Sequence, residues 1–529
     1  MVVCCQVNRK NLTLAISMAL VMGSASADFG PTIELSSLNG TNGFALNGAN
    51  AGDESGTSVS VAGDINGDGI DDLIIGAPYA TTGAAYAGKS YLVFGSDQGL
   101  PNPLNLSTLN GDTGFVINGE SAYDYSGAAV SAAGDINGDG IDDLIIGAPG
   151  ASPNVDYSGA SYVVFGDDQG LPNPLNLSSI DGSNGIVFNG VANYDESGTS
   201  VSAAGDINGD GIDDLIIGAP YASGGDGAGY VVFGSDQAWT SPINLSGLNG
   251  TNGFLINSVA DADSLGISVS AAGDINGDGV DDLVIGAIFA GTEGASYVVF
   301  GSDQAWSSPL ELSGLDGSDG FAINGVNPSD YAGISVSAAG DINADEIDDL
   351  IIGAPEADPN GDGSGASYVV FGSDQAWTTP LNLSSLNGSN GFMSIGVNAG
   401  DGSGTSVGFA GDINVDGFDD VIIGAPAADP NGVGSGASYV VYGSDQAFAS
   451  SINLSSLDGT NGFVINGVSA GDNSGGSVSA AGDLNKDGFD DLVTGARFAD
   501  PNEDNSGVSY VVYGGGIGDD DIIFANSFE

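Results

Sequence analysis

A short pattern of apolar and polar positions recurs along almost the whole chain. In its first copy, Ser58–Gly63 alternates apolar with small polar residues, residues 73–77 form a continuous apolar run, and residues 90–95 and Gly114–Asn118 are rich in β-branched and aromatic side chains. Short runs of this kind, bounded by Gly, Asn and Asp, are typical of β-strands. The sequence shows no helical apolar period with capping residues. The pattern therefore predicts four short strands in each copy, which we term the first to fourth strands.

The string Asp-Ile-Asn-Gly-Asp-Gly-Ile-Asp-Asp marks each copy. It begins at Asp64, Asp135 and Asp206, and close variants follow at intervals of 67–71 residues, beginning at Asp274, Asp341, Asp412 and Asp483. Four-stranded units repeated radially are the blades of a β-propeller, and seven blades lie within the usual range. We therefore predict an all-β fold, a seven-bladed β-propeller of four-stranded blades over residues 28–514. A length of 529 residues alone would have suggested several separate domains.

The phase of the repeat predicts how the ring closes. A strand of the fourth type at residues 44–47 precedes the first copy, and the chain ends shortly after the seventh strand of the third type, at residues 510–514. The last blade thus lacks its own outer strand. We expect the N-terminal strand to complete that blade and cover its open edge.

An acidic loop joins the first strand to the second in every copy. In residues 64–72, carboxylate or amide side chains stand at positions 1, 3, 5 and 9, position 7 offers its carbonyl, and Gly69 at position 6 permits a sharp turn. Hard oxygen ligands at this spacing suit Ca²⁺, and carboxylates so close repel one another without a cation. An EF-hand is excluded because position 12 is Ile75 rather than Glu. A metal-free polar turn is the alternative for one loop, but seven copies in phase favour up to seven Ca²⁺ sites.

The expected ligands are the residues at positions 1, 3, 5, 7 and 9 of each loop. They are Asp64, Asn66, Asp68, Ile70, Asp72, Asp135, Asn137, Asp139, Ile141, Asp143, Asp206, Asn208, Asp210, Ile212, Asp214, Asp274, Asn276, Asp278, Val280, Asp282, Asp341, Asn343, Asp345, Ile347, Asp349, Asp412, Asn414, Asp416, Phe418, Asp420, Asp483, Asn485, Asp487, Phe489 and Asp491. Glu346 replaces the position-6 Gly in the fifth loop, and Lys486 stands at position 4 of the seventh. The sites are therefore expected to be unequal, with the fifth the weakest.

Residues 63–78, Gly-Asp-Ile-Asn-Gly-Asp-Gly-Ile-Asp-Asp-Leu-Ile-Ile-Gly-Ala-Pro, resemble the FG-GAP repeat of integrin α-subunit propellers. The resemblance covers about residues 33–514. It departs where Ile288 and Arg497 replace the Pro, and the Phe-Gly expected before the first strand is not kept. It implies a propeller fold and bound calcium. In the absence of an inserted ligand-binding domain, stalk or membrane helix, the chain looks more like bacterial secreted proteins built wholly of such repeats.

The resemblance also implies two faces. The acidic loops share one face with the third-to-fourth connections, and the remaining connections share the other, which is the ligand face in integrins. Tyrosines fall on that second face, as recognition residues or as covers of the blade tops: Tyr79, Tyr123, Tyr125, Tyr194, Tyr221 and Tyr331. Trp239, Trp306 and Trp377 fall in three third-to-fourth connections, where they either stack on sugars or pin the loops to outer strands.

Charge excludes whole classes of protein. The chain has 69 Asp and Glu against 5 Lys and Arg, a net charge of −64, and no His. Nucleic-acid binding and docking on anionic lipid both need basic clusters and are excluded. The lack of His excludes Ser-His-Asp catalysis and zinc sites with His ligands.

The N-terminus is typical of an exported protein. Arg9 and Lys10 precede an apolar run at residues 12–22, and Ala25-Ser26-Ala27 is a cleavage signal, so residues 1–27 are predicted to be a signal peptide. Cys4 and Cys5 would leave with it. We expect a secreted or cell-surface protein without membrane insertion.

Two classes of function stay open on the sequence alone. The first is an exported calcium-binding module for adhesion or binding, with an unknown protein or glycan ligand and no catalytic activity. The second is an enzyme or accessory subunit in extracellular polysaccharide degradation, and a calcium-dependent lectin lies between the two. Residues 515–529 break the repeat as a short acidic-aromatic tail, for which a sorting role and a frayed end are both open.

Overall fold

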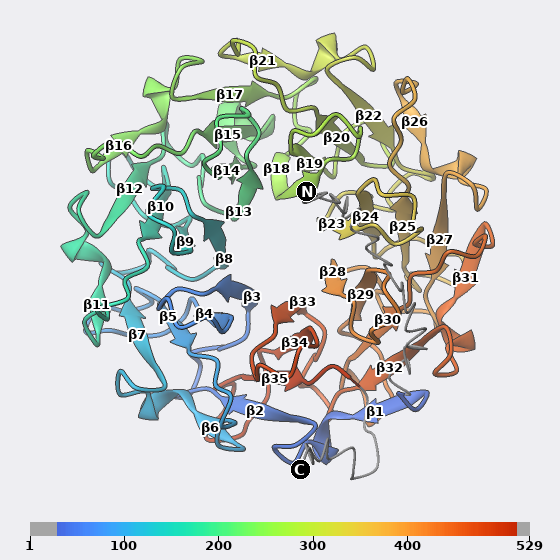
Figure 1. Ribbon diagram of the computed structural model, residues 1–529, viewed down its shortest axis with the longest axis horizontal. Coiled ribbons are helices and arrows are strands. Elements are labelled where there is room, and N and C mark those ends of the chain that lie inside the picture. Colours follow the sequence, from blue (N-terminus) through green and yellow to red (C-terminus); the bar gives the residue numbers. More distant parts are fainter. Residues whose placement is uncertain (1–28, 516–529) are drawn as a thin grey trace, which may run out of the picture.

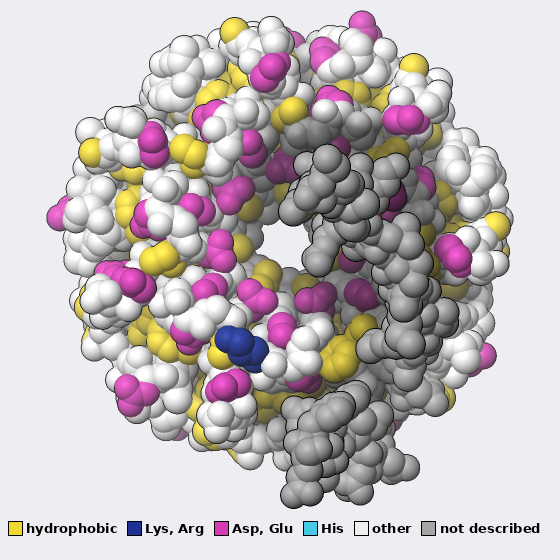
Figure 2. Space-filling view, in the orientation of Figure 1, with side chains coloured by type: hydrophobic (Ala, Val, Ile, Leu, Met, Phe, Trp, Pro, Cys, Tyr) yellow, Lys and Arg dark blue, Asp and Glu magenta, His cyan; other side chains and the backbone are white. Residues whose placement is uncertain are grey.

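The computed structural model describes residues 29–515, which form a closed ring of seven sheets (Figure 1). The space-filling view shows that the ring is open at its centre (Figure 2). The predicted signal peptide and nearly all of the predicted C-terminal tail lie outside the described residues. Within residues 29–515 the helices are one short turn, α1 (Ala222–Gly225), and a three-residue turn before each fourth strand. The prediction of an all-β, seven-bladed β-propeller is confirmed.

Each blade contains the four predicted strands in antiparallel order. The first strands are β3 (Ser58–Gly63), β8 (Ala129–Gly134), β13 (Ser200–Gly205), β18 (Leu265–Gly273), β23 (Val336–Gly340), β28 (Ser406–Gly411) and β33 (Ser477–Gly482). The second strands are β4 (Asp72–Ala77), β9 (Asp143–Ala148), β14 (Asp214–Ala219), β19 (Asp282–Ala287), β24 (Asp349–Ala354), β29 (Asp420–Ala425) and β34 (Asp491–Ala496). The first strands lie nearest the axis (Figure 1).

The third and fourth strands lie further out. The third strands are β5 (Lys89–Val93), β10 (Ala160–Val164), β15 (Ala228–Val232), β20 (Ala295–Val299), β25 (Ala366–Val370), β30 (Ala437–Val441) and β35 (Val508–Val512). The fourth strands are β7 (Gly114–Asn118), β12 (Gly185–Asn189), β17 (Gly253–Asn257), β22 (Gly320–Asn324), β27 (Gly391–Ile395), β32 (Gly462–Asn466) and, for the seventh blade, β2 (Gly43–Asn47).

The prediction of four strands per blade was wrong by one. Each sheet has a fifth strand of two or three residues, parallel to the fourth and supplied by the connection that leads into the next fourth strand. In blade order these are β11 (Leu175–Asn176), β16 (Ile243–Asn244), β21 (Leu310–Glu311), β26 (Leu381–Asn382), β31 (Ser451–Asn453), β1 (Thr32–Glu34) and β6 (Leu104–Asn105). A two-residue strand is too short to show a period of two, which explains the omission.

The fifth strand is held by side chains as well as by backbone pairing. Asn176 of β11 lies beside Asn118 of β7, and the Asn118 Nδ2 donates to Asn176 Oδ1 at 3.1 Å. Asn324 and Asn382 repeat this contact at 3.3 Å. Asn176 and Asn382 begin Asn-Leu-Ser sequences, so the recurrence of that sequence has a structural reason.

The N-terminal segment closes the ring as predicted and extends further than predicted. Strand β2 pairs antiparallel with β35, from Gly43 opposite Val512 to Asn47 opposite Val508. In addition, β1 pairs parallel with β32 of the sixth blade. Glu34 accepts hydrogen bonds from the Nδ2 groups of Asn431 and Asn466, both at 2.8 Å. The segment therefore replaces a whole third-to-fourth connection, and it joins two blades rather than one.

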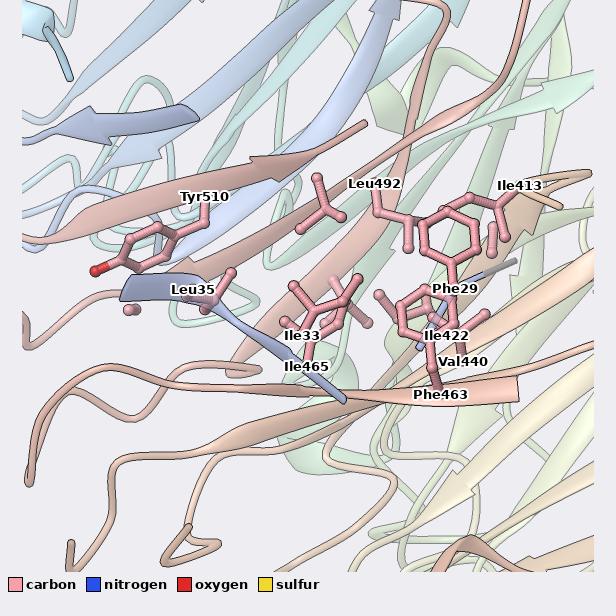
Figure 3. Packing of buried hydrophobic residues seen from close by; sticks show 14 of the residues in the cluster. Phe29, Ile33, Leu35, Ile413, Ile422, Val440, Phe463, Ile465, Leu492 and Tyr510 are labelled. Carbon is pink, nitrogen blue, oxygen red and sulfur yellow. The ribbon is translucent and has the colours of Figure 1, made fainter. Parts of the chain in front are cut away.

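Hydrophobic packing accompanies this closure (Figure 3). The Phe29 ring stacks on Phe463 at 4.6 Å between centroids, and Ile33 and Leu35 are buried in the same cluster. Ile465 of β32 completes the contact on the sixth blade.

The core lies between blades. Leu73 and Ile75 of β4 pack with Val493 and Val511 of the seventh blade, whereas Ile74 packs with Leu144 of the second. All six residues of every second strand are buried. Because a neighbouring blade covers each face of the sheet, the second strand reads as a continuous apolar run rather than as an alternation.

Candidate metal centres and the tyrosine face

Each acidic loop is a tight turn organised by its first carboxylate. In the first loop, Asp64 Oδ1 accepts the Asp68 N–H at 2.9 Å and Oδ2 accepts the Gly69 N–H at 2.8 Å. Gly67 and Gly69, at positions 4 and 6, have φ of +71° and +79°. Only Gly adopts such values without steric cost, so these two positions shape the turn.

The position-9 carboxylate is the buried end of the loop. Asp72 is fully buried at the start of β4, where it accepts the N–H groups of Ile65 at 3.2 Å and Gly95 at 2.9 Å. Burial, and then the nearby carboxylates of Asp68 and Asp64, raise the pKa of Asp72 to about 8. The same causes raise the pKa of the equivalent residues to about 8 or well above the ordinary value: Asp143, Asp214, Asp282, Asp349, Asp420 and Asp491.

The donor set of the loop suits a calcium ion. A buried carboxylate whose charged neighbours are themselves carboxylates needs a cation or a proton. The Asn66 Nδ2 lies 3.4 and 3.2 Å from the two Asp72 carboxylate oxygens, and rotation of this amide would present its oxygen instead. In residues 29–515 no three acidic side chains stand together at metal-ligand spacing. The side chains at positions 1, 3, 5 and 9 therefore fit Ca²⁺ by chemistry, with a local rearrangement to coordinate it.

Position 8 links the loops to one another. Asp142 of the second loop accepts the N–H of Asp64 in the first at 2.8 Å, and Asp213 accepts that of Asp135 at 2.8 Å. The series closes across the chain ends, where Asp71 accepts the Asp483 N–H at 2.9 Å. This role was not predicted from the sequence, although a second Asp stands before position 9 in every copy. Each loop is thus fixed to the next blade.

The loops are unequal in backbone strain. Glu346, at position 6 of the fifth loop, has φ of +67°, and Ala344 at position 4 has +65°. Val415 and Lys486 occupy position 4 of the last two loops at +59° and +58°. The fifth loop keeps the same turn as the others but has a side chain at both positions where the first four loops have Gly, at roughly 1–2 kcal/mol for each residue.

A tyrosine cluster lies on the opposite face. Tyr86 of the first blade stacks on Tyr125 at 6.3 Å between centroids, and Tyr79 meets Tyr125 edge-on at 5.7 Å. Tyr157 stacks on Tyr194 at 5.7 Å. Most of these rings are 39–57 % exposed, so they form a surface rather than a core. We call this set the tyrosine face: Tyr79, Tyr86, Tyr123, Tyr125, Tyr157 and Tyr194.

Several of these tyrosines occupy strained backbone positions. Tyr123 and Tyr125 have φ of +66° and +54°. The backbone has positive φ at the position of Tyr123 in every blade, with Gly52 at +70°, Ala262 at +62° and Ser329 at +68° among the others. The turn therefore belongs to the repeat, and Tyr is a bulky residue in a conformation that suits Gly.

The comparison with protein families decides the affiliation of the chain. The FG-GAP repeat matches seven segments, one for each blade: residues 55–93, 126–164, 197–232, 265–299, 332–370, 403–441 and 474–512. The chain belongs to the FG-GAP repeat family.

This FG-GAP protein is similar to parts of longer chains. Phosphatidylinositol-glycan-specific phospholipase D of Bos taurus is 29% identical over 383 residues, covering 69% of this chain and 42% of that one. The human protein of the same name is 39% identical over 164 residues, covering 31% and 18%. Integrin alpha-5 of Xenopus laevis is 28% identical over 237 residues, covering 44% and 20%. The chain thus spans less than half the length of these relatives.

Two further features of the FG-GAP ring concern the predicted surface residues. The rings of Trp306 and Trp377 stack on Phe254 and Phe321 at 4.3 and 4.0 Å, so these tryptophans do pin their loops to fourth strands. Tyr331 lies apart from the tyrosine face, edge-on to Phe289. Tyr86 and Tyr157 were not predicted as surface residues of this face, although both lie in second-to-third connections, which the resemblance places there. Among residues 29–515, the helices lack the length and apolarity that a membrane crossing needs.

Proposed function

We propose that this FG-GAP propeller is an exported calcium-binding protein that binds its ligand through the tyrosine face. The observation that carries the proposal is the cluster of tyrosine rings that contact one another on one face, most of them exposed. Rigid aromatic rings with a polar tip are effective recognition groups. An adhesion or binding role at or outside the cell surface fits the N-terminal segment, in which Ala25-Ser26-Ala27 is typical of a cleavage site.

Calcium has a structural part in this proposal. The seven loops would hold up to seven Ca²⁺ ions through positions 1, 3, 5, 7 and 9, on the face opposite the tyrosines. Bound calcium would neutralise loop carboxylates and fix the ends of neighbouring blades. The rigid ring would then present the tyrosine face, and the calcium ions would not contact the ligand.

The proposed role is binding rather than catalysis. Among the described residues, the buried position-9 carboxylates accept backbone N–H groups in the loops rather than facing an open cleft. Although two relatives are named as a phospholipase D, this chain matches less than half of their length. A catalytic site in the part of those proteins that does not align with this chain would be absent from this chain.

The experiment removes two tyrosines of this face without harming the fold. A Tyr123→Gly/Tyr125→Gly variant copies Gly400 and Gly402, which stand at these two positions in another repeat, so its melting temperature should match or exceed that of the wild type. Both proteins are applied with calcium to arrays of glycans and of extracellular proteins. Val433→Ser, at an 80 % exposed residue of the sixth blade, is the control. Loss of the array signals in the tyrosine variant alone supports the proposal, and unchanged signals contradict it.

A further inference from the structure

A separate pocket lies on the face of the acidic loops, between the third and fourth blades. Its volume is about 630 Å³, within the range of roughly 300–1,000 Å³ of small-molecule sites. Trp239 and Trp306, from successive third-to-fourth connections, line it together with Asn208 and Asp210 of the third acidic loop. Because these connections lie at the opposite end of the strands from the tyrosines, the pocket is distinct from the tyrosine face.

The aromatic walls of this pocket are held in place. The Trp306 ring stacks on Phe254 at 4.3 Å with 7° between the planes, and Phe233 packs against Phe254 at 5.9 Å. The Trp239 Nε1 donates to the Ser235 carbonyl at 3.2 Å. Both tryptophans are only partly buried although each is fixed. Fixed rings lose little conformational entropy when a ligand packs on them.

Polar groups surround these rings. Asp210, Asp303 and Gln304 line the pocket with carboxylate and amide groups. The Gln304 Nε2 donates to the Asp303 carboxylate, which orders the pair. Carboxylates and amides bind hydroxyl groups well, whereas the carboxylates repel an anionic ligand. Aromatic rings between hydroxyl-binding groups match the alternation of C–H faces and hydroxyl edges on a sugar ring.

The first two blades provide an internal comparison. The pocket between them has about 590 Å³ and the same position beside an acidic loop, but Leu100 and Leu171 occupy the places of the two tryptophans. Leucine therefore suffices to pack these connections on the ring. The tryptophans add an aromatic surface that the fold itself does not require.

We propose that the pocket between the third and fourth blades binds a neutral saccharide. One sugar ring packs on Trp239 and Trp306, and its hydroxyls hydrogen-bond to Asp303 and Gln304, which lie outside the calcium loop. This site goes beyond the proposed function, because it needs neither the tyrosine face nor its ligand.

Intrinsic fluorescence reports on this site directly, because the chain has 3 tryptophans. The full-length protein in calcium buffer is titrated with cellohexaose and mannohexaose, and with trigalacturonate as an anionic probe. A saturable change in tryptophan emission is expected with at least one neutral probe and not with trigalacturonate. Trp239→Leu and Trp306→Leu, which copy the first pocket, should each weaken binding by about 10-fold. Trp377→Leu, outside this pocket, should keep the wild-type affinity.

Melting curves of the variants show whether they fold. Should one tryptophan variant fail to fold, the other, together with Asp303→Ala, decides the matter. The proposal is overturned if no neutral probe gives a saturable change up to about 10 mM, or if the folded leucine variants bind as tightly as the wild type. Binding that disappears in Tyr123→Gly/Tyr125→Gly would also overturn it, because the saccharide would then occupy the tyrosine face.

Discussion

The two faces of the ring are made by the same seven repeats, yet the acidic loops of one face agree across the repeats, whereas the tyrosine-bearing connections of the other face diverge. In the acidic loops, positions 1, 3, 5, 8 and 9 carry the same residue in all seven copies. On the opposite face, the place of Tyr123 is taken by Gly52 in one blade, Ala262 in another and Ser329 in a third. A residue needed in every blade serves the ring as a whole, whereas a residue confined to two or three blades serves one location.

The physical reason for the uniform face is visible in its contacts. Each position-8 Asp accepts a backbone N–H of the preceding loop, and each position-9 Asp is buried at the start of a second strand. The loss of one such residue would leave a donor unpaired between two blades. In the described part of the ring, no such buried hydrogen bond between blades depends on the side chains of the exposed tyrosines.

The largest expected effect comes from opening the ring, which would break both faces together. Deletion of residues 29–47 removes β1 and β2 and the buried rings of Phe29 and Phe44, so β35 and β32 each lose a partner strand. We expect a much lower melting temperature and aggregation through the exposed edges. The measurement is thermal unfolding with light scattering.

Full-length protein carrying Glu34→Gln is the matched control for this deletion. An amide can still accept one of the two hydrogen bonds that Asn431 and Asn466 donate, so only a small loss is expected. A deleted protein that stays monomeric with an unchanged melting temperature would contradict the closure.

Removal of calcium tests the face of the acidic loops without altering the tyrosine face. With free calcium at 100 times Kd, each site stabilises the folded state by about 2.7 kcal/mol, so chelation should lower the melting temperature by roughly 10 °C or more. Calorimetry in chelator, and again after excess calcium is restored, measures the change. Equal melting temperatures in the two states would mean that the loops are metal-free turns.

Much of this uniform architecture was predictable because each element recurs in phase. The first strand Ser58–Gly63 and the fourth strand Gly114–Asn118 have the predicted bounds, and the pairing of β2 with β35 followed from the phase of the repeat. The position-6 strain at Glu346 was also foreseen from residue type. Local pattern sufficed wherever a residue acts within its own repeat.

The features that the sequence analysis missed depend on a neighbouring repeat. The fifth strand of one blade comes from the next copy, and Asp142 bonds to Asp64 across the boundary between two blades. Tyr86 becomes part of a cluster only because the first blade meets Tyr125 of the second. Such contacts join residues far apart in sequence, and no period within a single copy encodes them.

The fifth acidic loop is the least regular of the seven and tests how backbone strain affects calcium binding. Glu346, at φ of +67°, stands in a loop that must rearrange to coordinate the ion. Because Gly adapts to such a change more freely, Glu346→Gly should tighten the fifth calcium site by up to about fivefold, less whatever the lost negative charge contributes. The converse variant, Gly140→Glu, should weaken the second site, because Gly140 has φ of +88° with open space around it. Calcium titration calorimetry measures both. Opposite signs support the strain argument, and unchanged or weaker binding in Glu346→Gly contradicts it.

The smallest expected effect concerns a residue that is Asp in every blade although it lies on the same face as the tyrosines. Asp124, between Tyr123 and Tyr125, is 6 % exposed and accepts the Ser121 N–H at 2.8 Å, and an Asp stands at this place in every blade. Burial raises the pKa of Asp124 from 3.8 to about 6. The hydrogen bond from Ser121 opposes this shift in part, and the charge of Glu120 adds to it. The folded protein therefore holds its proton more tightly than the unfolded chain, and the stability that this provides is lost as pH rises from about 4 through 6.

Substitution of Asp124 by Asn separates the two explanations for this uniformity. Asn keeps the acceptor for Ser121 but has no charge to bury. If the Asp serves only as an acceptor, Asp124→Asn should be more stable than the wild type by about 1 kcal/mol above pH 6, and the gain should vanish below about pH 4. Urea unfolding at pH 4 and pH 7 measures this, with Asp97→Asn, an exposed residue on the other face, as the control. A loss of stability at pH 7 would instead show that the fold needs the charge of this Asp in every blade. The Asp would then be the same in all blades for a structural reason, as in the acidic loops.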